Sequence, residues 1–358
     1  MTKALPLDST IGILGGGQLG RMLSVAASRL GYKTHIFEPH TNPPAAQVAD
    51  QVTTASYDDI VALRSFARSV DIITYEFENI PTTALDEIET QRPIRPNRKA
   101  LQISQDRQTE KEFLEALGLK TAPFSPVVTL QDLKAALTTV GTPAILKTRR
   151  LGYDGKGQAR LLDADAADEA LACMAGAPAI LEGFVNFSHE VSVIAARSLN
   201  GDIACFDPGE NVHFDGILRT TKVPARLNSS QLTDAVLLAA QILNKLDYVG
   251  VMGVELFVTS EGLIVNEIAP RVHNSGHWTQ NGCIVDQFEQ HIRAITGLPL
   301  GDGQRHMDVE MENLIGDDMD KIPDLLTANE AALHLYGKAE TKPGRKMGHV
   351  NRVRPRSR

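Results

Sequence analysis

The sequence is poor in cysteine and in aromatic residues, and it contains no long apolar run. Its three cysteines are far apart and form no C-x-x-C pair, which excludes a disulfide framework and favours free thiols in a reducing compartment. No apolar run approaches the roughly 20 residues that a membrane-spanning helix needs. Residues 1–10 lack the apolar core of a secretion signal. We therefore expect a cytoplasmic protein that does not bind membranes.

Positive charge is also in deficit, with 36 Lys and Arg against 44 Asp and Glu and a formal net charge of −8. This balance disfavours non-specific binding to nucleic acids, which depends on neutralising phosphates. A basic stretch from Lys338 to the C-terminus is the exception. Such a stretch is usually solvated surface, but it also suits a small anionic substrate.

The length of 358 residues predicts two or three domains, and the strand and helix patterns divide the chain accordingly. Residues 1–104 alternate strand and helix patterns, which predicts a parallel sheet with helices on both faces. Residues 105–300 contain a small α+β unit over about 121–185 and become rich in strands from 186 to 300. Residues 301–358 form a last segment, and we expect its tail, 351–358, to be unstructured.

A glycine motif lies near the N-terminus, where Gly15, Gly17 and Gly20 spell G-x-G-x-x-G between a strand pattern and a helix pattern. Glu38 ends the next strand, where the ribose-binding acid of a dinucleotide site would stand. The motif therefore fits a nicotinamide enzyme. It fits equally a tight turn that leaves a helix N-terminus open to an anion.

Two glutamates are predicted to face each other across a hairpin. A three-residue turn, 260–262, with Gly262 in the left-handed conformation, places Glu255 opposite Glu267. Like charges in opposition are unfavourable, so a cation between them is favoured, and Mg²⁺ takes such oxygen ligands. A shared proton or an offset register is the alternative. Asn266 is expected to point to the other face of the strand.

Three further stretches carry candidate phosphate or anion contacts. Residues 147–157, "KTRRLGYDGKG", put Lys147 beside a glycine-rich loop that suits a phosphate, although an ordinary hairpin turn is the alternative. Residues 266–282 hold Arg271, His273, Asn274 and His277, with Arg271 as an anion clamp. The alternative there is a solvated surface loop. Residues 336–349 place three cations, Lys338, Arg345 and Lys346, near glycines.

Seven motifs occur in order along the chain: "GGGQLGRM", "YEFENI", "KTRRLGYDGKGQ", "GENVHFDGILRTT", "YVGVMGVELFV", "NEIAPRVHNSGHWTQNG" and "KPGRKMGH". Together they resemble the ATP-grasp superfamily and, within it, the N5-carboxyaminoimidazole ribonucleotide synthetases of de novo purine synthesis. The resemblance implies an α/β and α+β architecture: a Rossmann-like N-terminal domain that binds no dinucleotide, a small lid domain and a C-terminal mixed sheet. It also implies a ligase that carboxylates aminoimidazole ribonucleotide with bicarbonate, through carboxyphosphate, and releases ADP and phosphate.

The resemblance assigns roles to residues of this chain. ATP would be bound by Arg107, Lys147, Gly152, Tyr153, Asp154, Gly155, Lys156, Gly157, Gln158, Glu182, Gly183, Phe184, Val185, Glu190, His213, Asn266 and Glu267. Mg²⁺, as two ions, would be held by Glu255 and Glu267. The reaction centre would contain Tyr153, Asp154, Arg271, His273 and Asn274. The ribonucleotide would contact Gln18, Leu19, Glu76, Lys338, Arg345 and Lys346, and Glu38 would become an ordinary strand-end acid.

Two points of the resemblance stay open. Relatives usually continue past the "GH" motif with a helical segment that the tail of this chain does not resemble. A homodimer is implied by the family only. Another ATP-grasp ligase, such as formate-dependent glycinamide ribonucleotide transformylase, and a non-catalytic nucleotide-binding protein remain the alternatives.

Overall fold

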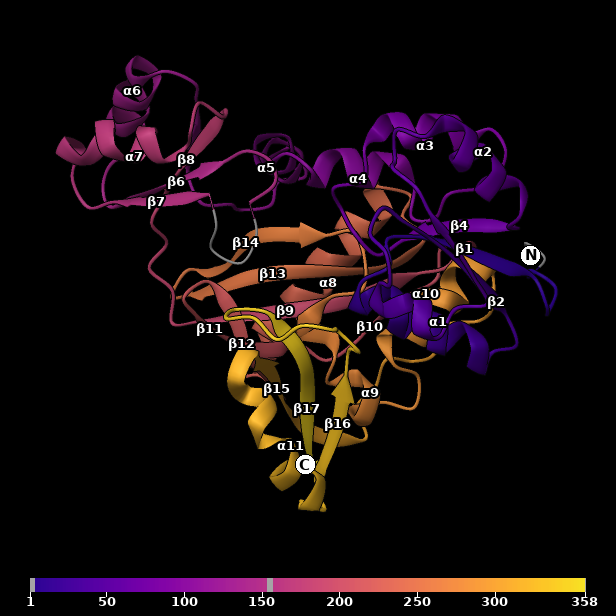
Figure 1. Ribbon diagram of the computed structural model, residues 1–358. Helices are drawn as coiled ribbons and strands as arrows, with labels where there is room; N and C mark the ends of the chain where they lie inside the picture. The colour runs from indigo at the N-terminus through magenta and orange to yellow at the C-terminus, as the bar shows by residue number, and fades with distance from the viewer. Residues whose placement is uncertain (1–3, 153–156, 358) are drawn as a thin grey trace.

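A computed structural model describes residues 4–152 and 157–357 and contains three sheets (Figure 1). Within these residues, no helix combines the length and the apolar character that crossing a membrane requires.

The N-terminal region is a parallel sheet with helices on both faces, as the alternating pattern predicts. Its strands run in the order β3-β2-β1-β4. Their bounds are Thr10–Leu14 (β1), Lys33–Glu38 (β2), Gln51–Thr54 (β3) and Ile72–Tyr75 (β4). The helices are Gln18–Arg29 (α1), Ile60–Arg68 (α2), Thr82–Glu89 (α3) and Arg98–Ser104 (α4), with a 3₁₀ turn at Pro44–Gln47 (η1). Ile13 packs with α1 on one face, and Leu14 packs with α2 on the other.

The lid is a four-stranded antiparallel sheet, ordered β5-β8-β6-β7, that projects to one side of the molecule (Figure 1). Its strands are Phe124–Val127 (β5), Ala144–Thr148 (β6), Gln158–Leu161 (β7) and Ala179–Gly183 (β8). Helix α5 (Arg107–Ala116) leads into it, and Leu130–Val140 (α6), Ala164–Ala166 (η2) and Ala167–Cys173 (α7) complete it. Leu146 is buried in the lid core, so its neighbours Ile145 and Lys147 point to the opposite face of the sheet.

The third sheet has nine strands, eight of them in the order β14-β13-β9-β11-β12-β15-β17-β16, with β10 paired to β9. The strands are His189–Arg197 (β9), Ile203–Cys205 (β10), Gly209–Phe214 (β11), Ile217–Val223 (β12), Gly250–Thr259 (β13), Gly262–Ala269 (β14), Met307–Ile315 (β15), Ala331–Leu335 (β16) and Lys346–Pro355 (β17). The helices are Ser229–Lys245 (α8), Asn274–Gly276 (η3), Thr279–Gly282 (α9), Gln287–Thr296 (α10), Gly316–Lys321 (η4) and Ile322–Thr327 (α11).

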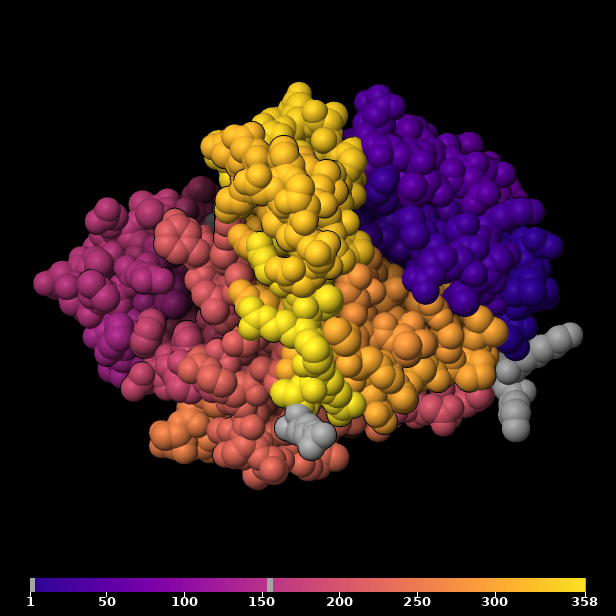
Figure 2. Space-filling view, turned by 90° about the horizontal axis from the view of Figure 1, so that it is seen from below, coloured from indigo at the N-terminus to yellow at the C-terminus, as the bar shows by residue number. Residues whose placement is uncertain are grey.

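The expectation of an unstructured tail is wrong, because residues 346–355 form β17 between β15 and β16. Val350 packs on Leu314 on one face, while His349 and Asn351 are fully buried on the other. Both faces are therefore covered, and the polar residues at buried positions hide the strand pattern. Seen from below, this C-terminal segment lies between the lid and the N-terminal domain (Figure 2).

Candidate active site

A cavity of about 990 Å³ opens where the N-terminal domain, the lid and the large sheet meet. Its lining includes most of the residues that the resemblance singles out among the described part of the chain: Gln18, Leu19, Glu76, Arg107, Lys147, Gly152, Gln158, Glu190, His213, Glu255, Asn266, Glu267, Arg271, His273, Asn274 and Lys346. Residues more than 300 positions apart in the chain thus share one space.

The backbone N–H groups of the glycine turn are bound by a carboxylate of the protein itself. Glu76 accepts hydrogen bonds from the backbone N–H groups of Gly17 at 2.7 Å and of Leu19 and Gly20 at 3.1 Å. The expectation of a helix N-terminus open to an anion is therefore wrong, because this carboxylate already fills the place of a pyrophosphate. Burial raises the pKa of Glu76, and the N–H groups of Gly17 and Gly20 oppose that shift. A Cβ at Gly17 would lie 2.7 Å from Glu76 Oε1, which explains the glycine.

Glu38 also has a more specific place than an ordinary strand-end acid. Its Oε2 accepts a hydrogen bond from the backbone N–H of Gly16 at 2.8 Å, and its Oε1 lies 2.6 Å from Nδ1 of His40. Two carboxylates thus hold successive peptide groups of the glycine turn. Glu38 already has partners within the protein, whereas in a dinucleotide enzyme the acid at this position must bind the ribose.

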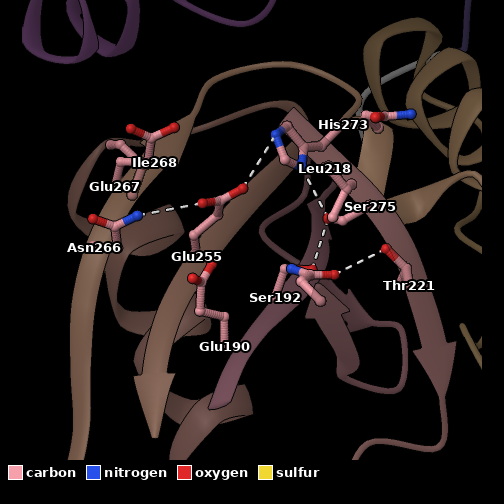
Figure 3. A network of polar contacts seen from close by, with 12 residues as sticks. Glu190, Ser192, Leu218, Thr221, Glu255, Asn266, Glu267, Ile268, His273 and Ser275 are labelled. Atoms are coloured by element: carbon pink, nitrogen blue, oxygen red, sulfur yellow. Dashed lines mark hydrogen bonds and ion pairs between the residues drawn. The ribbon is translucent and has the colours of Figure 1, made fainter. Parts of the chain in front are cut away.

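The predicted opposition of Glu255 and Glu267 is confirmed, although for a different reason. The turn has two residues, because Thr259 pairs with Gly262, whose φ is +118°. A bulge then adds Asn266 to β14 and restores the Glu255–Glu267 register. The expectation that Asn266 points to the other face is consequently wrong: its Nδ2 lies 3.4 Å from Glu255 Oε2 (Figure 3).

The two carboxyls differ in their electrostatic surroundings. Burial and the charge of Glu267 raise the pKa of Glu255 to about 7. Burial also acts to raise the pKa of Glu267, but Arg107 and Lys147 hold it below its ordinary value. Arg107 Nη1 lies 3.1 Å from Glu267 Oε2. A cation bound beside these two buried carboxyls would stabilise the charged form of both.

The donors at this hairpin suit Mg²⁺ only as part of a larger set. Glu255, Glu267 and the Asn266 amide offer oxygen ligands, and Mg²⁺ commonly takes its remaining ligands from phosphates and water. Among the described residues, no group of three or more His, Cys, Asp or Glu side chains is arranged to hold a metal. The residues therefore fit an ion shared with a phosphorylated ligand and do not form a closed protein cage.

Lys147 is held at the cavity by a buried glutamate. Glu182 Oε2 lies 2.8 Å from Lys147 Nζ and 3.6 Å from Lys111 Nζ. Burial acts to raise the pKa of Glu182, but the two lysines lower it to about 2. Glu182 therefore faces the lysines, and the strand end 182–185 does not line the cavity in the described structure.

Glu190 and His213 meet at the same end of the cavity, with Nδ1 of His213 2.7 Å from Glu190 Oε2. Burial acts to lower the pKa of His213, but the contact with Glu190 and the charges of Glu255 and Glu267 together outweigh it, so the net shift is upward. A charged pair at the cavity rim offers both an acceptor and a donor to a polyhydroxyl group.

The loop after β14 is buried, which excludes a solvated surface loop. Arg271 Nε lies 2.6 Å from Glu78 Oε2. The sequence predicts no role for Glu78, although it stands in the motif "YEFENI". Asn274 exchanges two hydrogen bonds with Asn313, at 2.8 and 2.9 Å. Burial and Arg271 lower the pKa of His273 well below its ordinary value. His277 does not line the cavity and packs 4.7 Å from the ring of His349.

The remaining predicted residues fall into two groups. Lys338 and Arg345 lie beside the cavity without lining it: Lys338 Nζ donates to the carbonyl of Lys346 at 2.6 Å, and Arg345 donates to the carbonyl of Glu340. Tyr153, Asp154, Gly155 and Lys156 lie outside the described residues. Gly157 has a φ of +69°, and a Cβ there would lie 2.6 Å from Thr148 Oγ1, so the loop needs this glycine.

Three family models match successive parts of the chain. They are described as the ribonucleotide synthetase preATP-grasp domain (residues 8–105), the ATP-grasp domain (112–288) and the phosphoribosylaminoimidazole carboxylase C-terminal domain (310–357).

Relatives of similar length carry one name. The N5-carboxyaminoimidazole ribonucleotide synthase of Brucella melitensis is 56% identical over 99% of both chains. That of Bacillus subtilis is 45% identical over 96% of this chain and 90% of its own.

Solved structures agree. An ADP complex of an N5-carboxyaminoimidazole ribonucleotide synthetase has a TM-score of 0.96 and 42% identity, covering 99% of this chain and 94% of its own. The enzyme from Aspergillus clavatus, solved with ADP and 5-aminoimidazole ribonucleotide, has a TM-score of 0.92 and 32% identity, covering 97% and 94%. The chain therefore belongs to the N5-carboxyaminoimidazole ribonucleotide synthase family, the ATP-grasp ligases that act in purine biosynthesis.

Proposed function

We propose that this chain carboxylates 5-aminoimidazole ribonucleotide with bicarbonate at the expense of ATP, through carboxyphosphate, and that the cavity is its active site. The observation that carries the proposal is the convergence of a nucleotide-sized cavity, a lid lysine, two opposed carboxylates and a buried arginine loop. Phosphoryl transfer needs mainly positioning and charge neutralisation, and these groups supply both.

ATP binds between the lid and the large sheet in this proposal. Lys147 and Arg107 face the phosphates, and the stretch from Gly152 to Gln158, with Tyr153 to Lys156 in it, supplies further contacts to ATP. The Glu190–His213 pair contacts the ribose end. The adenine lies against the strand end at Glu182 to Val185 once the lid has closed. Closure of the lid also excludes water from the labile intermediate.

Glu255 and Glu267 hold Mg²⁺, as two ions, together with the phosphates, and Asn266 completes this end of the site. The metal supplies positive charge to the transferring phosphoryl group. The opposition of the two carboxylates and the raised pKa of Glu255 support this assignment.

Bicarbonate binds between Arg271, His273 and Asn274. Arg271 is fixed by Glu78, so its guanidinium is oriented before the anion arrives. Tyr153 and Asp154 also act at the reaction centre. The ribonucleotide lies at the other end of the cavity, with its base near Gln18, Leu19 and Glu76 and its 5′-phosphate near Lys338, Arg345 and Lys346.

The test is an ADP-release assay with ATP, bicarbonate, Mg²⁺ and aminoimidazole ribonucleotide, in which each component is omitted in turn. Full activity should require all four. Turnover with formate in place of bicarbonate would identify a different ATP-grasp ligase, and ATP binding without ADP release would identify a non-catalytic protein. We also propose, from the family alone, a cytoplasmic homodimer, which sedimentation velocity tests for assembly.

A further inference from the structure

Two buried serines connect the interior of the large sheet to the imidazole ring of His273 (Figure 3). Ser192 on β9 is 1% exposed and Ser275 on η3 is 0% exposed. Their Oγ atoms are 2.7 Å apart, and Ser275 Oγ lies 2.8 Å from His273 Nδ1. Neither serine lines the cavity within the described part of the chain, so neither belongs to the binding residues above.

The two hydrogen bonds that join Ser192, Ser275 and His273 can have only one donor-to-acceptor direction. Among the described residues, the Ser192 hydroxyl has a single hydrogen-bond partner, Ser275 Oγ. A buried hydroxyl hydrogen without an acceptor costs roughly 1–3 kcal/mol, so Ser192 donates to Ser275. Ser275 then uses its own hydrogen toward His273, and Nδ1 is the acceptor. A neutral imidazole carries one N–H, which must therefore be on Nε2.

The Nε2 side of the ring faces the cavity. It lies 3.6 Å from Glu255 Oε1, beside the carboxylate pair. The backbone of His273 is held on both sides by Gln287, whose Oε1 accepts from the N–H at 2.9 Å and whose Nε2 donates to the carbonyl at 2.8 Å. Gly253 leaves space for the ring, because a Cβ there would lie 2.8 Å from His273 Cβ.

We propose that Ser192 and Ser275 are positioning residues that hold His273 in the tautomer with its hydrogen on Nε2. Resting on the proposed function, His273 then donates a hydrogen bond to an oxygen of the bicarbonate-derived carboxyl group. It does not accept the proton that the amine of the ribonucleotide loses. A fixed donor aimed at developing negative charge needs no reorganisation when the reaction occurs.

Nitrogen NMR of the wild-type protein, labelled in its histidine rings and free of substrates, tests the tautomer directly. The His273 signals are assigned by their loss in His273→Gln. We expect a protonated Nε2 and a hydrogen-free Nδ1. A hydrogen on Nδ1 overturns the proposal. Since this measurement needs no turnover, its failure differs from failure of the proposed function, which would appear as no ADP release by the wild type.

Kinetics test the role of the serines. In Ser275→Ala, kcat for ADP release should fall about 10- to 100-fold, as when the partner of a functional histidine is removed, while the KM for ATP changes by less than about twofold. The control is Thr221→Val, which removes a buried hydroxyl that donates to Asn211 at 2.9 Å in the same sheet and does not contact His273. The control should keep kcat within about twofold. Wild-type kcat in Ser275→Ala, or an equal loss in Thr221→Val, overturns the proposal.

Discussion

At the scale of single residues, the carboxylate of Glu267 is the group on which the proposed metal and phosphate chemistry depends most. It faces Glu255 across the hairpin and lies 3.1 Å from Arg107. Glu267→Gln keeps the shape and removes the charge, so metal binding weakens and Arg107 loses its partner. We expect kcat for ADP release to fall by about 100-fold or more, measured at saturating ATP over a series of Mg²⁺ concentrations.

Glu261→Gln is the matched control, because Glu261 lies exposed in the turn of the same hairpin. It should leave kcat within about twofold of the wild type. Near-normal activity of Glu267→Gln at limiting Mg²⁺ would refute the assignment of Glu267 to the metal.

Glu76 makes a second prediction at this scale, on stability. Its two oxygens accept three backbone hydrogen bonds at the start of α1. Glu76→Gln replaces one of these oxygens by an NH₂ group that faces other N–H groups. We expect the free energy of unfolding, measured with urea, to fall by about 1–3 kcal/mol.

The comparison for this variant is Glu87→Gln, which breaks a solvent-exposed ion pair with Arg64. That change should cost less than about 1 kcal/mol. If both variants unfold at the same urea concentration as the wild type, the carboxylate of Glu76 does not stabilise the turn.

Which residues the sequence could predict depends on how far apart their partners are. Counting residues along one hairpin with a three-residue turn predicts the Glu255–Glu267 opposition, but the observed two-residue turn reaches that register only through the bulge at Asn266. The contact of Glu76 with the glycine turn and that of Glu78 with Arg271 join different elements, so no local pattern reveals them. The resemblance gives Glu38 no role, and its contact with the Gly16 N–H on a neighbouring loop is likewise not visible in any local pattern.

At the scale of elements, regular alternation predicted the N-terminal sheet, and buried polar residues hid β17. The sequence does not predict the short edge strand β3, because its side chains are mostly exposed and show no apolar pattern. The sequence does not predict the bulge in β14, because its extra residue is visible only in the register between β13 and β14. The bulge turns Asn266 toward Glu255. Sequence patterns report burial periodicity, and these elements depart from it.

Strand β17 carries a prediction of its own, because Asn351 connects it to the loop of the site. Asn351 Nδ2 donates to the carbonyl of His277 at 3.0 Å and to Asn281 Oδ1 at 2.8 Å. Asn351→Ala should lower the free energy of unfolding by about 1–3 kcal/mol, measured with urea. Arg354→Ala, on the exposed end of the same strand, should change it by less than about 0.5 kcal/mol. If both variants keep the free energy of unfolding of the wild type, the hydrogen bonds of Asn351 do not stabilise the attachment of β17 to the loop of the site.

At the scale of the whole molecule, helix α10 joins the N-terminal domain to the large sheet. Arg29 on α1 forms ion pairs with Asp286 and Glu289 at the start of α10. Arg95 donates a hydrogen bond to the carbonyl of Ile295 near the end of α10. One apolar core runs through this junction and includes Ile13, Val251 and Met311 from three regions of the chain. The cavity therefore has a fixed wall on this side, and the lid, which has its own core, is the part able to move against it.

His291 at the centre of α10 makes this junction sensitive to acid. Its Nδ1 accepts from the N–H of Val251 at 3.1 Å and its Nε2 lies 2.8 Å from Thr74 Oγ1, so the neutral ring bridges two domains. Burial lowers its pKa from 6.5 to about 3. The unfolded chain therefore takes up a proton below about pH 6.5 that the folded chain refuses. The stability that His291 contributes is complete above that pH and is lost as the pH falls toward about 3.

His291→Asn removes this titrating group and leaves every other one in place. The variant should be less stable than the wild type at about pH 7.5, because its side chain cannot bridge Val251 and Thr74 in the same way. The difference in free energy of unfolding should then shrink by about 1.4 kcal/mol for each pH unit below about 6.5, as expected for one proton. Urea unfolding of both proteins at about pH 7.5, 6 and 5 measures it. A difference that stays constant over this range would show that His291 is not held neutral, and that the junction between the domains does not exclude its proton.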